Sequence, residues 1–322
     1  MTNASLFSNL LSVPVLAFAL GAVAFLLKTD IRIPDAAYKL VSMVLLFGIG
    51  LKGGVALHKI QITEVLGPLL ITIGLGLLIP SLAYVGLKVF PQLSRIDRGA
   101  IAAHYGSTSL VTFTTALVFL EASNIPYESY VTTLLVAMEI PGILLGILFA
   151  AGIGKVIHNR ELIREVFFGK TILLMVGGLV IGFAAGISGL EKVAPLFVDL
   201  QPAVLTLFLL TLGYVAMSNF KDFQVVGLRF GLFAIAFPVI AGAIGSTVGV
   251  MAGMSVGGAT ALAVLCASAS YIAAPAACDI AIPEASKSLT LLSSIGITFP
   301  FNLAVGIPLY LWFAQSFSNY LG

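Results

Sequence analysis

Charged residues are scarce in this chain, and their scarcity excludes several classes of protein. Asp, Glu, Lys and Arg together make up 9% of the 322 residues, and 16 basic against 14 acidic side chains leave a formal net charge of +2. No basic run is interleaved with aromatic residues, so nothing indicates a nucleic-acid-binding surface. No glycine-rich phosphate-binding loop occurs, which argues against a process driven by bound ATP.

Cysteine is also rare. The two cysteines, Cys266 and Cys278, lie in apolar sequence, which excludes a disulfide framework. Hydrophobic residues, in contrast, reach 59%, and the mean hydropathy is +1.11. No soluble domain has a core large enough to bury that share, so we expect lipid to surround most of the chain. The first apolar stretch follows no basic segment and has no small-residue cleavage site, and we interpret it as a retained helix.

Apolar stretches of about 20 residues, the length that crosses a bilayer, predict an all-α integral membrane protein with about ten transmembrane helices. We place these spans near Leu10–Leu27, Tyr38–Leu57, Val65–Val89, Gly99–Leu120, Tyr130–Gly152, Ile172–Leu190, Pro202–Asn219, Leu228–Ala252, Gly258–Ala277 and Leu289–Phe317.

The basic residues predict the orientation of these spans, because Lys and Arg accumulate on the cytoplasmic side. The loops after odd-numbered spans carry thirteen of them, and the opposite face carries only Lys59 and Lys192. We therefore expect both termini outside the cytoplasm, on the periplasmic or outer side of the membrane. The thirteen are Lys28, Arg32, Lys39, Lys88, Arg95, Arg98, Lys155, Arg160, Arg164, Lys170, Lys221, Arg229 and Lys287.

The chain is predicted to be one membrane domain with an internal repeat. Residues 1–154 hold the first five spans, residues 155–170 form a basic cytoplasmic connector, and residues 171–322 hold the second five. An odd number of spans in each half makes the halves run in opposite directions, which is the 5+5 inverted repeat of many secondary transporters. Prolines recur at corresponding places of the two halves, which supports the repeat: Pro34 with Pro202, Pro126 with Pro283, and Pro141 with Pro300. The alternative is that these prolines coincide by chance.

Two runs of small and hydroxyl-bearing residues interrupt the apolar pattern at matching positions of the two halves. They are residues 104–112 in span four and residues 266–271 in span nine. Within a bilayer, backbone leaves the helix only where protein or a wet cavity satisfies its polar groups. A matched pair of such interruptions points to the binding site of a transporter. We therefore expect spans four and nine to be broken helices that cross at mid-membrane.

The composition of the two breaks suits small ions. Free N–H groups at helix N-termini favour an anion, and hydroxyl groups can donate to an anion or coordinate sodium through oxygen. No Arg lies in the interior of a predicted span, since Arg229 stands at the very start of span eight, and this favours a small monoanion over phosphate or a dicarboxylate. The alternative is that small residues only let the helices pack closely. The substrate-binding candidates are Gly106, Ser107, Thr108, Ser109, Ser268, Ala269, Ser270 and Tyr271.

Glu139 is an acidic residue in the middle of span five, where an ionised side chain is costly unless it is paired or wet. Pro141 follows two residues later and frees a backbone carbonyl one turn earlier. Glu139 is thus a candidate sodium ligand, a proton carrier, or a protonated side chain bonded to its own helix. We expect no resident cofactor, and for a bound sodium ion the candidate ligands are Ser109, Thr112, Glu139, Ser268 and Ser270.

In their order along the chain, several short segments resemble the sodium-dependent bicarbonate transporter family known from cyanobacteria, together with its bacterial homologues. The resemblance covers nearly the whole chain and implies a ten-helix inverted repeat with core and gate domains. It further implies a homotrimer, sodium-coupled bicarbonate uptake across the inner membrane, and a PII-like regulatory protein on the cytoplasmic face. The segments are Gly50–Gly54, Gly106–Thr112, Ile125–Glu128, Glu139–Pro141, Ser268–Pro275 and Gly306–Leu309.

Two departures from the family pattern keep alternatives open. Tyr271 stands where the family carries an acidic residue, and the connector is shorter. The leading hypothesis is a sodium-coupled bicarbonate symporter, not an enzyme. The alternatives are a sodium- or proton-coupled carrier of another small monoanion, a regulatory membrane protein without transport, and an intramembrane hydrolase. A hydrolase would use His104 with Ser107 or Thr108, but no nearby carboxylate is present to orient the imidazole.

Overall fold

The computed structural model of the protein describes residues 11–58, 60–219 and 227–321, and within them it contains helices and no strands. Seven helical stretches in these residues are long and apolar enough to cross a membrane, which makes the chain a multi-pass membrane protein. They are Asp35–His58, Thr63–Val89, Val131–Ala151, Arg160–Glu191, Gln201–Ser218, Leu228–Met251 and Lys287–Tyr320. Leu10, the predicted start of the first span, lies outside the described residues.

The first half of the chain follows the predicted order of spans, with boundaries that shift by a few residues. Span four is divided, because α5 and α6 are separate helices with non-helical backbone between them. The elements are α2 (Val13–Leu26), α3 (Asp35–His58), α4 (Ile62–Gly86) with the 3-10 turn η1 (Leu87–Val89), α5 (Arg95–Gly106), α6 (Leu110–Ala122) and α7 (Val131–Ala151).

The second half also follows the predicted order of spans, and the predicted span nine is divided between α14 and α15. The elements are α10 (Lys170–Glu191), the π-helical turn η2 (Pro195–Asp199), α11 (Gln201–Asn219), α13 (Leu228–Met251), α14 (Val256–Ala267), α15 (Ala273–Ala281), α16 (Lys287–Leu291), η4 (Leu292–Thr298), α17 (Phe299–Phe301), η5 (Asn302–Gly306) and α18 (Ile307–Leu321).

The last span contains π-helical turns on both sides of its proline. η4 precedes Pro300 and η5 follows it. Proline cannot donate a backbone hydrogen bond, and single π-helical turns inside helices concentrate at functional sites. The last span therefore has irregular backbone around Pro300, and this segment lies beside the second break, since Asn302 donates to the Ala267 carbonyl.

The connector between the halves is itself helical. It consists of α8 (Ile153–His158) and α9 (Arg160–Phe168). Leu162 and Val166 of α9 are buried in a cluster that includes residues of α7 and α15. The connector, residues 155–170, thus packs against the second broken helix through α9.

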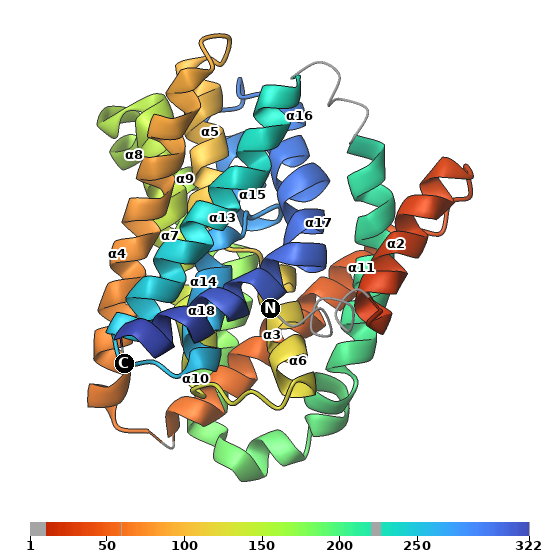
Figure 1. The fold of residues 1–322 in the computed structure, drawn as a ribbon, viewed down its shortest axis with the longest axis vertical. Helices are drawn as coiled ribbons and strands as arrows, with labels where there is room; N and C mark the ends of the chain where they lie inside the picture. Colours follow the sequence, from red (N-terminus) through yellow and green to blue (C-terminus); the bar gives the residue numbers. More distant parts are fainter. Residues whose placement is uncertain (1–10, 59, 220–226, 322) are drawn as a thin grey trace.

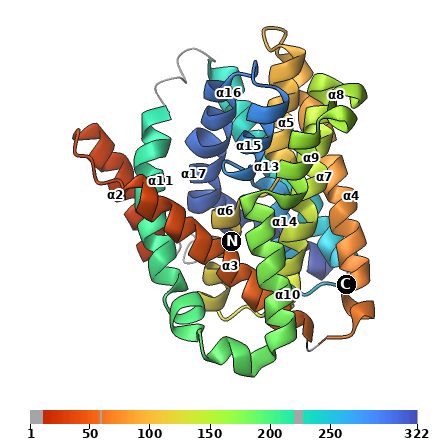
Figure 2. The ribbon, with the colours of Figure 1, turned by 180° about the vertical axis from the view of Figure 1, so that it is seen from behind.

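The helices form two groups that are distinguished by their packing partners. In the four-helix group, α3 packs on α10 and α2 packs on α11. In the six-helix group, α4, α5 and α7 pack together, and so do α13, α14 and α18. Figures 1 and 2 show α2 and α11 at one flank of the molecule and α4 with α7 at the other. The broken helices lie between these flanks.

Packing partners recur between the two halves. The contact of α3 with α10 pairs span two with span six, and that of α2 with α11 pairs span seven with span one. Glycines permit the close approach in both pairs. An added Cβ at Gly178 would lie 2.7 Å from the Phe47 carbonyl oxygen, and one at Gly213 would overlap the Phe18 carbonyl.

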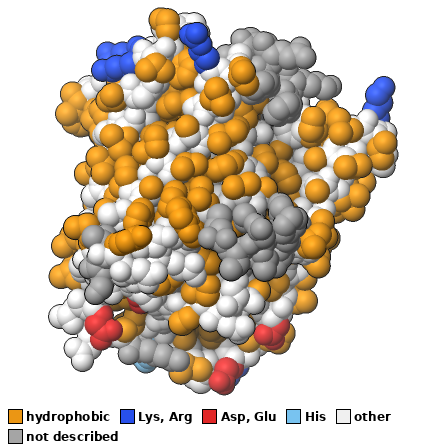
Figure 3. Space-filling model, in the orientation of Figure 1, with side chains coloured by type: hydrophobic (Ala, Val, Ile, Leu, Met, Phe, Trp, Pro, Cys, Tyr) orange, Lys and Arg blue, Asp and Glu red, His pale blue; other side chains and the backbone are white. Residues whose placement is uncertain are grey.

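The surface separates apolar and charged side chains into bands. On the described part of the face in Figure 3, hydrophobic side chains cover the middle, Lys and Arg gather at the upper end, and Asp and Glu gather at the lower end. The upper end is where α4 leads into α5 and where α8 and α16 lie (Figure 1). Such a band of apolar surface between charged ends is what a lipid-embedded protein needs.

Candidate functional site

The first break lies between α5 and α6. α5 ends at Gly106, and Ser107 has an extended backbone with φ −100° and ψ 142°. Ser109 caps α6, because its side-chain oxygen accepts a hydrogen bond from the Thr112 amide at 3.2 Å. Gly106 packs against Gly142 of α7, where an added Cβ at Gly106 would lie 2.8 Å from Gly142 Cα. Only glycine permits this approach.

The second break lies between α14 and α15. α14 ends at Ala267, and residues 268–272 are not helical. The Asn302 side-chain amide donates to the Ala267 carbonyl at 2.9 Å, and the Tyr310 hydroxyl donates to Asn302 Oδ1 at 2.7 Å. Asn302 thus satisfies a carbonyl group that the break releases.

The two breaks bind each other through backbone groups. The Ser270 amide donates to the carbonyl of His104 at 2.8 Å and to that of Ser107 at 3.0 Å. The Ser109 amide donates to Ser268 Oγ at 3.0 Å. An unpaired amide away from water costs free energy, so each break satisfies groups that the other leaves open. Sequence elements about 160 residues apart therefore form one unit.

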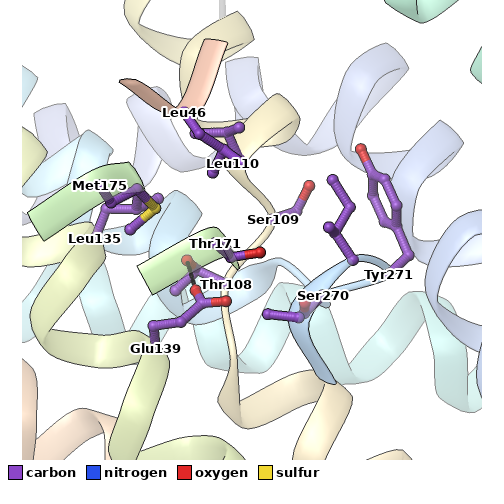
Figure 4. A pocket seen from close by; sticks show the side chains of 12 residues that line it. Leu46, Thr108, Ser109, Leu110, Leu135, Glu139, Thr171, Met175, Ser270 and Tyr271 are labelled. Atoms are coloured by element: carbon purple, nitrogen blue, oxygen red, sulfur yellow. Dashed lines mark hydrogen bonds between the residues drawn. The ribbon is translucent and has the colours of Figure 1, made fainter. Parts of the chain in front are cut away.

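A small cavity, here called the ion cavity, lies where the breaks meet (Figure 4). The space open to the centre of a water molecule is about 10 Å³, which is room for about one water. Glu139 is the only charged residue among those that line it. The lining residues are Leu46, Thr108, Ser109, Leu110, Leu135, Glu139, Thr171, Met175, Ser270, Tyr271, Ile272 and Ala273.

Glu139 of α7 supplies the carboxyl group of this cavity. Its side chain is 3% exposed. Thr108 Oγ1 donates to Glu139 Oε2 at 3.2 Å, and Ser107 also lies near this carboxyl group. Figure 4 shows Thr108 directly over the carboxylate, with Ser270 on the other side. No basic side chain lines the cavity, so an ionised Glu139 would need a cation to neutralise it.

Several other polar groups at the crossing are buried and lack a hydrogen-bond partner among the described residues. They include the hydroxyl oxygens of Ser107, Thr112 and Tyr271. Most buried polar groups in proteins are paired, and exceptions concentrate where a ligand or water binds. These three hydroxyl groups are therefore available to a bound ion.

The structure sorts the residues predicted for the site into two sets. Thr108, Ser109, Glu139, Ser270 and Tyr271 all line the ion cavity. The others lie at or beside the crossing without lining the cavity: Gly106 through close packing, Ser107 and Ser268 through hydrogen bonds, Ala269 within the second break, and Thr112 in the first turn of α6.

Three residues of the four-helix group that close the cavity were not among those predicted from sequence. Leu46 belongs to α3, and Thr171 and Met175 belong to α10. Thr171 carries a hydroxyl group at the start of an apolar span, and this was the only feature of the sequence that could have marked it as a site residue. Leu46 and Met175 are ordinary apolar residues whose position depends on how α3 and α10 pack.

His104 does not form the arrangement that a hydrolase needs. Its Nδ1 bonds to the Ala100 carbonyl at 2.8 Å, and its Nε2 has no partner among the described residues. Neither Ser107 nor Thr108 hydrogen-bonds to the imidazole. Nucleophilic catalysis requires that contact.

Comparison with known families identifies one match. A family profile described as the Na+-dependent bicarbonate transporter superfamily matches residues 14–315 of the chain. The matched range includes both breaks, Glu139 and all residues that line the ion cavity. A comparison with curated proteins found no match.

Proposed function

Because the chain belongs to the Na+-dependent bicarbonate transporter superfamily, we propose that it is a sodium-coupled symporter that carries bicarbonate across the bacterial inner membrane. The observation that carries this proposal is the ion cavity. There the two broken helices enclose one buried carboxyl group and several hydroxyl groups without a basic side chain. A chain of a transporter family is not expected to act as an enzyme.

Sodium is the proposed partner of Glu139. Hard cations take oxygen ligands, and carboxylate, hydroxyl and carbonyl oxygens all suit them. Glu139, Thr108, Ser109 and Ser270 bring such oxygens to a space the size of about one water. We also propose Thr112 and Ser268 as contributors, since both lie within the same crossing. A sodium ion here offsets the carboxylate charge that nothing else at the cavity offsets.

Bicarbonate is proposed to bind beside sodium, held by the amide and hydroxyl groups of the breaks. The candidates are the eight residues named from sequence, Gly106 to Ser109 and Ser268 to Tyr271. Bicarbonate has four heavy atoms and exceeds the open space of the described conformation, so the cavity must widen when it binds. Sodium and bicarbonate together are neutral, which lowers the electrostatic cost of holding both away from water.

The ten-span count and the inverted repeat are part of the same proposal. They are supported by the equivalent packing of α3 on α10 and of α11 on α2, and by the equivalent breaks in spans four and nine. The charge bands of Figure 3 support the proposed orientation, with both termini outside the cytoplasm. A homotrimer and a PII-like partner on the cytoplasmic face rest on the family resemblance alone.

Transport in liposomes tests the function. Purified protein is reconstituted, and uptake of labelled bicarbonate is measured with an inward sodium gradient and with choline in place of sodium. We expect uptake only with sodium. Equal uptake with choline would favour proton coupling, and no uptake in either condition would favour a protein without transport. Competition by unlabelled formate or nitrate tests whether another small monoanion is the preferred substrate.

A matched pair of variants tests the role of Glu139. Glu139→Gln removes the buried charge, and we expect sodium-dependent uptake to be lost. Glu121→Gln makes the same change at an exposed position outside the ion cavity, where the carboxylate accepts a hydrogen bond from Tyr127. Uptake should survive there. Equal sodium dependence in both variants would remove Glu139 from the sodium site.

A further inference from the structure

A second, larger cavity, here called the vestibule, lies beside the ion cavity. Its volume is about 560 Å³. It is bounded by the linker between α2 and α3, by the start of α3, by α11, and by α16 and η4. Its lining residues are Asp30, Arg32, Ile33, Pro34, Asp35, Tyr38, Thr211, Leu212, Val215, Tyr271, Leu291 and Ile295.

The mouth of the vestibule is charged and belongs to the basic end of the molecule. Arg32 forms an ion pair with Asp30 at 2.6 Å, and both side chains are at least half exposed. The hydrogen bond from the guanidinium lowers the pKa of Asp30 to about 2, so the pair stays charged at neutral pH. The linker that carries it follows span one, on the side that the basic residues assign to the cytoplasm.

Of the residues that the structure describes, Tyr271 alone lines both the ion cavity and the vestibule. Its ring contacts Phe299 edge to face, with 5.4 Å between the ring centroids. Its hydroxyl is buried and has no hydrogen-bond partner among the described residues. In Figure 4 the ring stands at the opposite side of the ion cavity from Leu135 and Met175. One aromatic side chain therefore separates the two spaces.

The backbone at Tyr271 is suited to movement. Residues 268–272 are not helical, so no ladder of helical hydrogen bonds holds this backbone, and the Tyr271 hydroxyl lies near Ser109. Tyr271 also lies on the seam between the two helix groups. On one side of the vestibule are α3 and α11, and on the other are the second break, α16 and η4. A displacement of one group against the other would change the space around the ring.

We propose that Tyr271 is the gate between the ion cavity and a water-filled vestibule that opens to the cytoplasm, so that its ring controls release of the ions. This inference rests on the proposed function, because it assigns one exit to the ion site. The ring blocks the passage in the described conformation, and movement of the second break with its helix group clears it. Size, not the hydroxyl group, does the blocking.

Cysteine labelling tests the gate without relying on transport. In a background with Cys266→Ala and Cys278→Ala, Leu110→Cys places a reporter in the ion cavity and Val215→Cys places one in the vestibule. A membrane-impermeant cationic methanethiosulfonate is applied from the cytoplasmic side of inside-out vesicles, with neither sodium nor bicarbonate present. Each reporter is combined with Tyr271, Tyr271→Phe and Tyr271→Ala.

The gate predicts a specific pattern of rates. Labelling of the ion-cavity reporter should rise by about tenfold or more in Tyr271→Ala and stay unchanged in Tyr271→Phe, because a gate limits access by its bulk. The vestibule reporter should react quickly in all three backgrounds, which also shows that the variants fold. Equal ion-cavity rates in all three would overturn the gate, and failure to label Val215→Cys from the cytoplasmic side would overturn the vestibule assignment. Either failure leaves the bicarbonate uptake experiment unaffected.

Discussion

The contact between Gly106 and Gly142 is the most exacting packing feature at the site. It brings the end of α5 against α7, the helix that carries Glu139. An added Cβ at Gly142 would lie 2.7 Å from Gly106 Cα and would overlap the Gly106 carbonyl group, against 3.4–4 Å for ordinary contact. In Gly142→Ala, α7 and the first break must therefore separate by at least 0.7 Å, the difference between 2.7 and 3.4 Å.

That displacement sets the size of the expected effect. Glu139 Oε2 and Thr108 Oγ1 are 3.2 Å apart, and a further 0.7 Å takes them beyond hydrogen-bond range. Overpacking of this kind costs about 1–3 kcal/mol of stability. Misplacement of a binding group by about 1 Å can reduce a rate by about 100-fold. We therefore expect a large loss of uptake with a moderate loss of stability in Gly142→Ala.

The assay combines sodium-dependent bicarbonate uptake in liposomes with the thermal unfolding midpoint in detergent. Gly74→Ala is the matched control, because no atom lies within 4 Å of its added Cβ and the glycine is exposed in α4. Alanine should stabilise that helix by up to about 1 kcal/mol and leave uptake unchanged. Uptake above half of the wild-type rate in Gly142→Ala, at equal protein content, would show that the contact between Gly106 and Gly142 does not position the Glu139 site.

Three further perturbations have defined outcomes. Asn302→Ala leaves the Ala267 carbonyl and the Tyr310 hydroxyl unpaired, and should lower the thermal unfolding midpoint by the equivalent of about 2–3 kcal/mol; an unchanged midpoint would contradict this. Glu128→Ala removes the acceptor for the Ser255 amide and hydroxyl at the start of α14 and should cost about 1–2 kcal/mol in the same assay. The ion pair with Arg32 lowers the pKa of Asp30 from 3.8 to about 2. The contribution of the ionised Asp30 to the stability of the folded protein is therefore fully present above pH 3.8 and is lost only as the pH falls through about 2. Asp30→Asn should therefore leave the pH profile of uptake unchanged from roughly pH 5 to 9, where an Asp with an ordinary pKa is also ionised, and a shifted profile would show that another group senses this charge.

The breaks show how far local sequence predicts structure in this chain. Runs of Ser, Thr and Gly weaken a helix wherever they occur, so residues 104–112 and 266–271 pointed to α5 ending at Gly106 and α14 ending at Ala267. The boundaries of spans two, five and eight were also close, since apolar length is a local property. The connector was the exception. α9 is helical because Leu162 and Val166 find a cluster contributed by α7 and α15.

The sequence predicted the chemical character of the candidate site but only some of the residues that line it. Glu139, Thr108, Ser109, Ser270 and Tyr271 carry polar groups in apolar sequence, and all five line the ion cavity. Their mutual placement could not be derived, because it depends on the two breaks exchanging backbone hydrogen bonds. Leu46, Thr171 and Met175 come from α3 and α10, whose packing is set by glycine contacts between the two halves.

The sequence was sufficient to predict that this protein is embedded in a lipid bilayer, which segments are apolar enough to span the bilayer, and where the helices break. These follow from composition and from the local strength of helical hydrogen bonding. The tertiary structure alone shows that both breaks meet at one buried carboxyl group and that Tyr271 lines both the ion cavity and the vestibule. These positions depend on the close approach of helices that are distant in the sequence. The geometry of that approach depends on many residues together, so it cannot be predicted from any one of them.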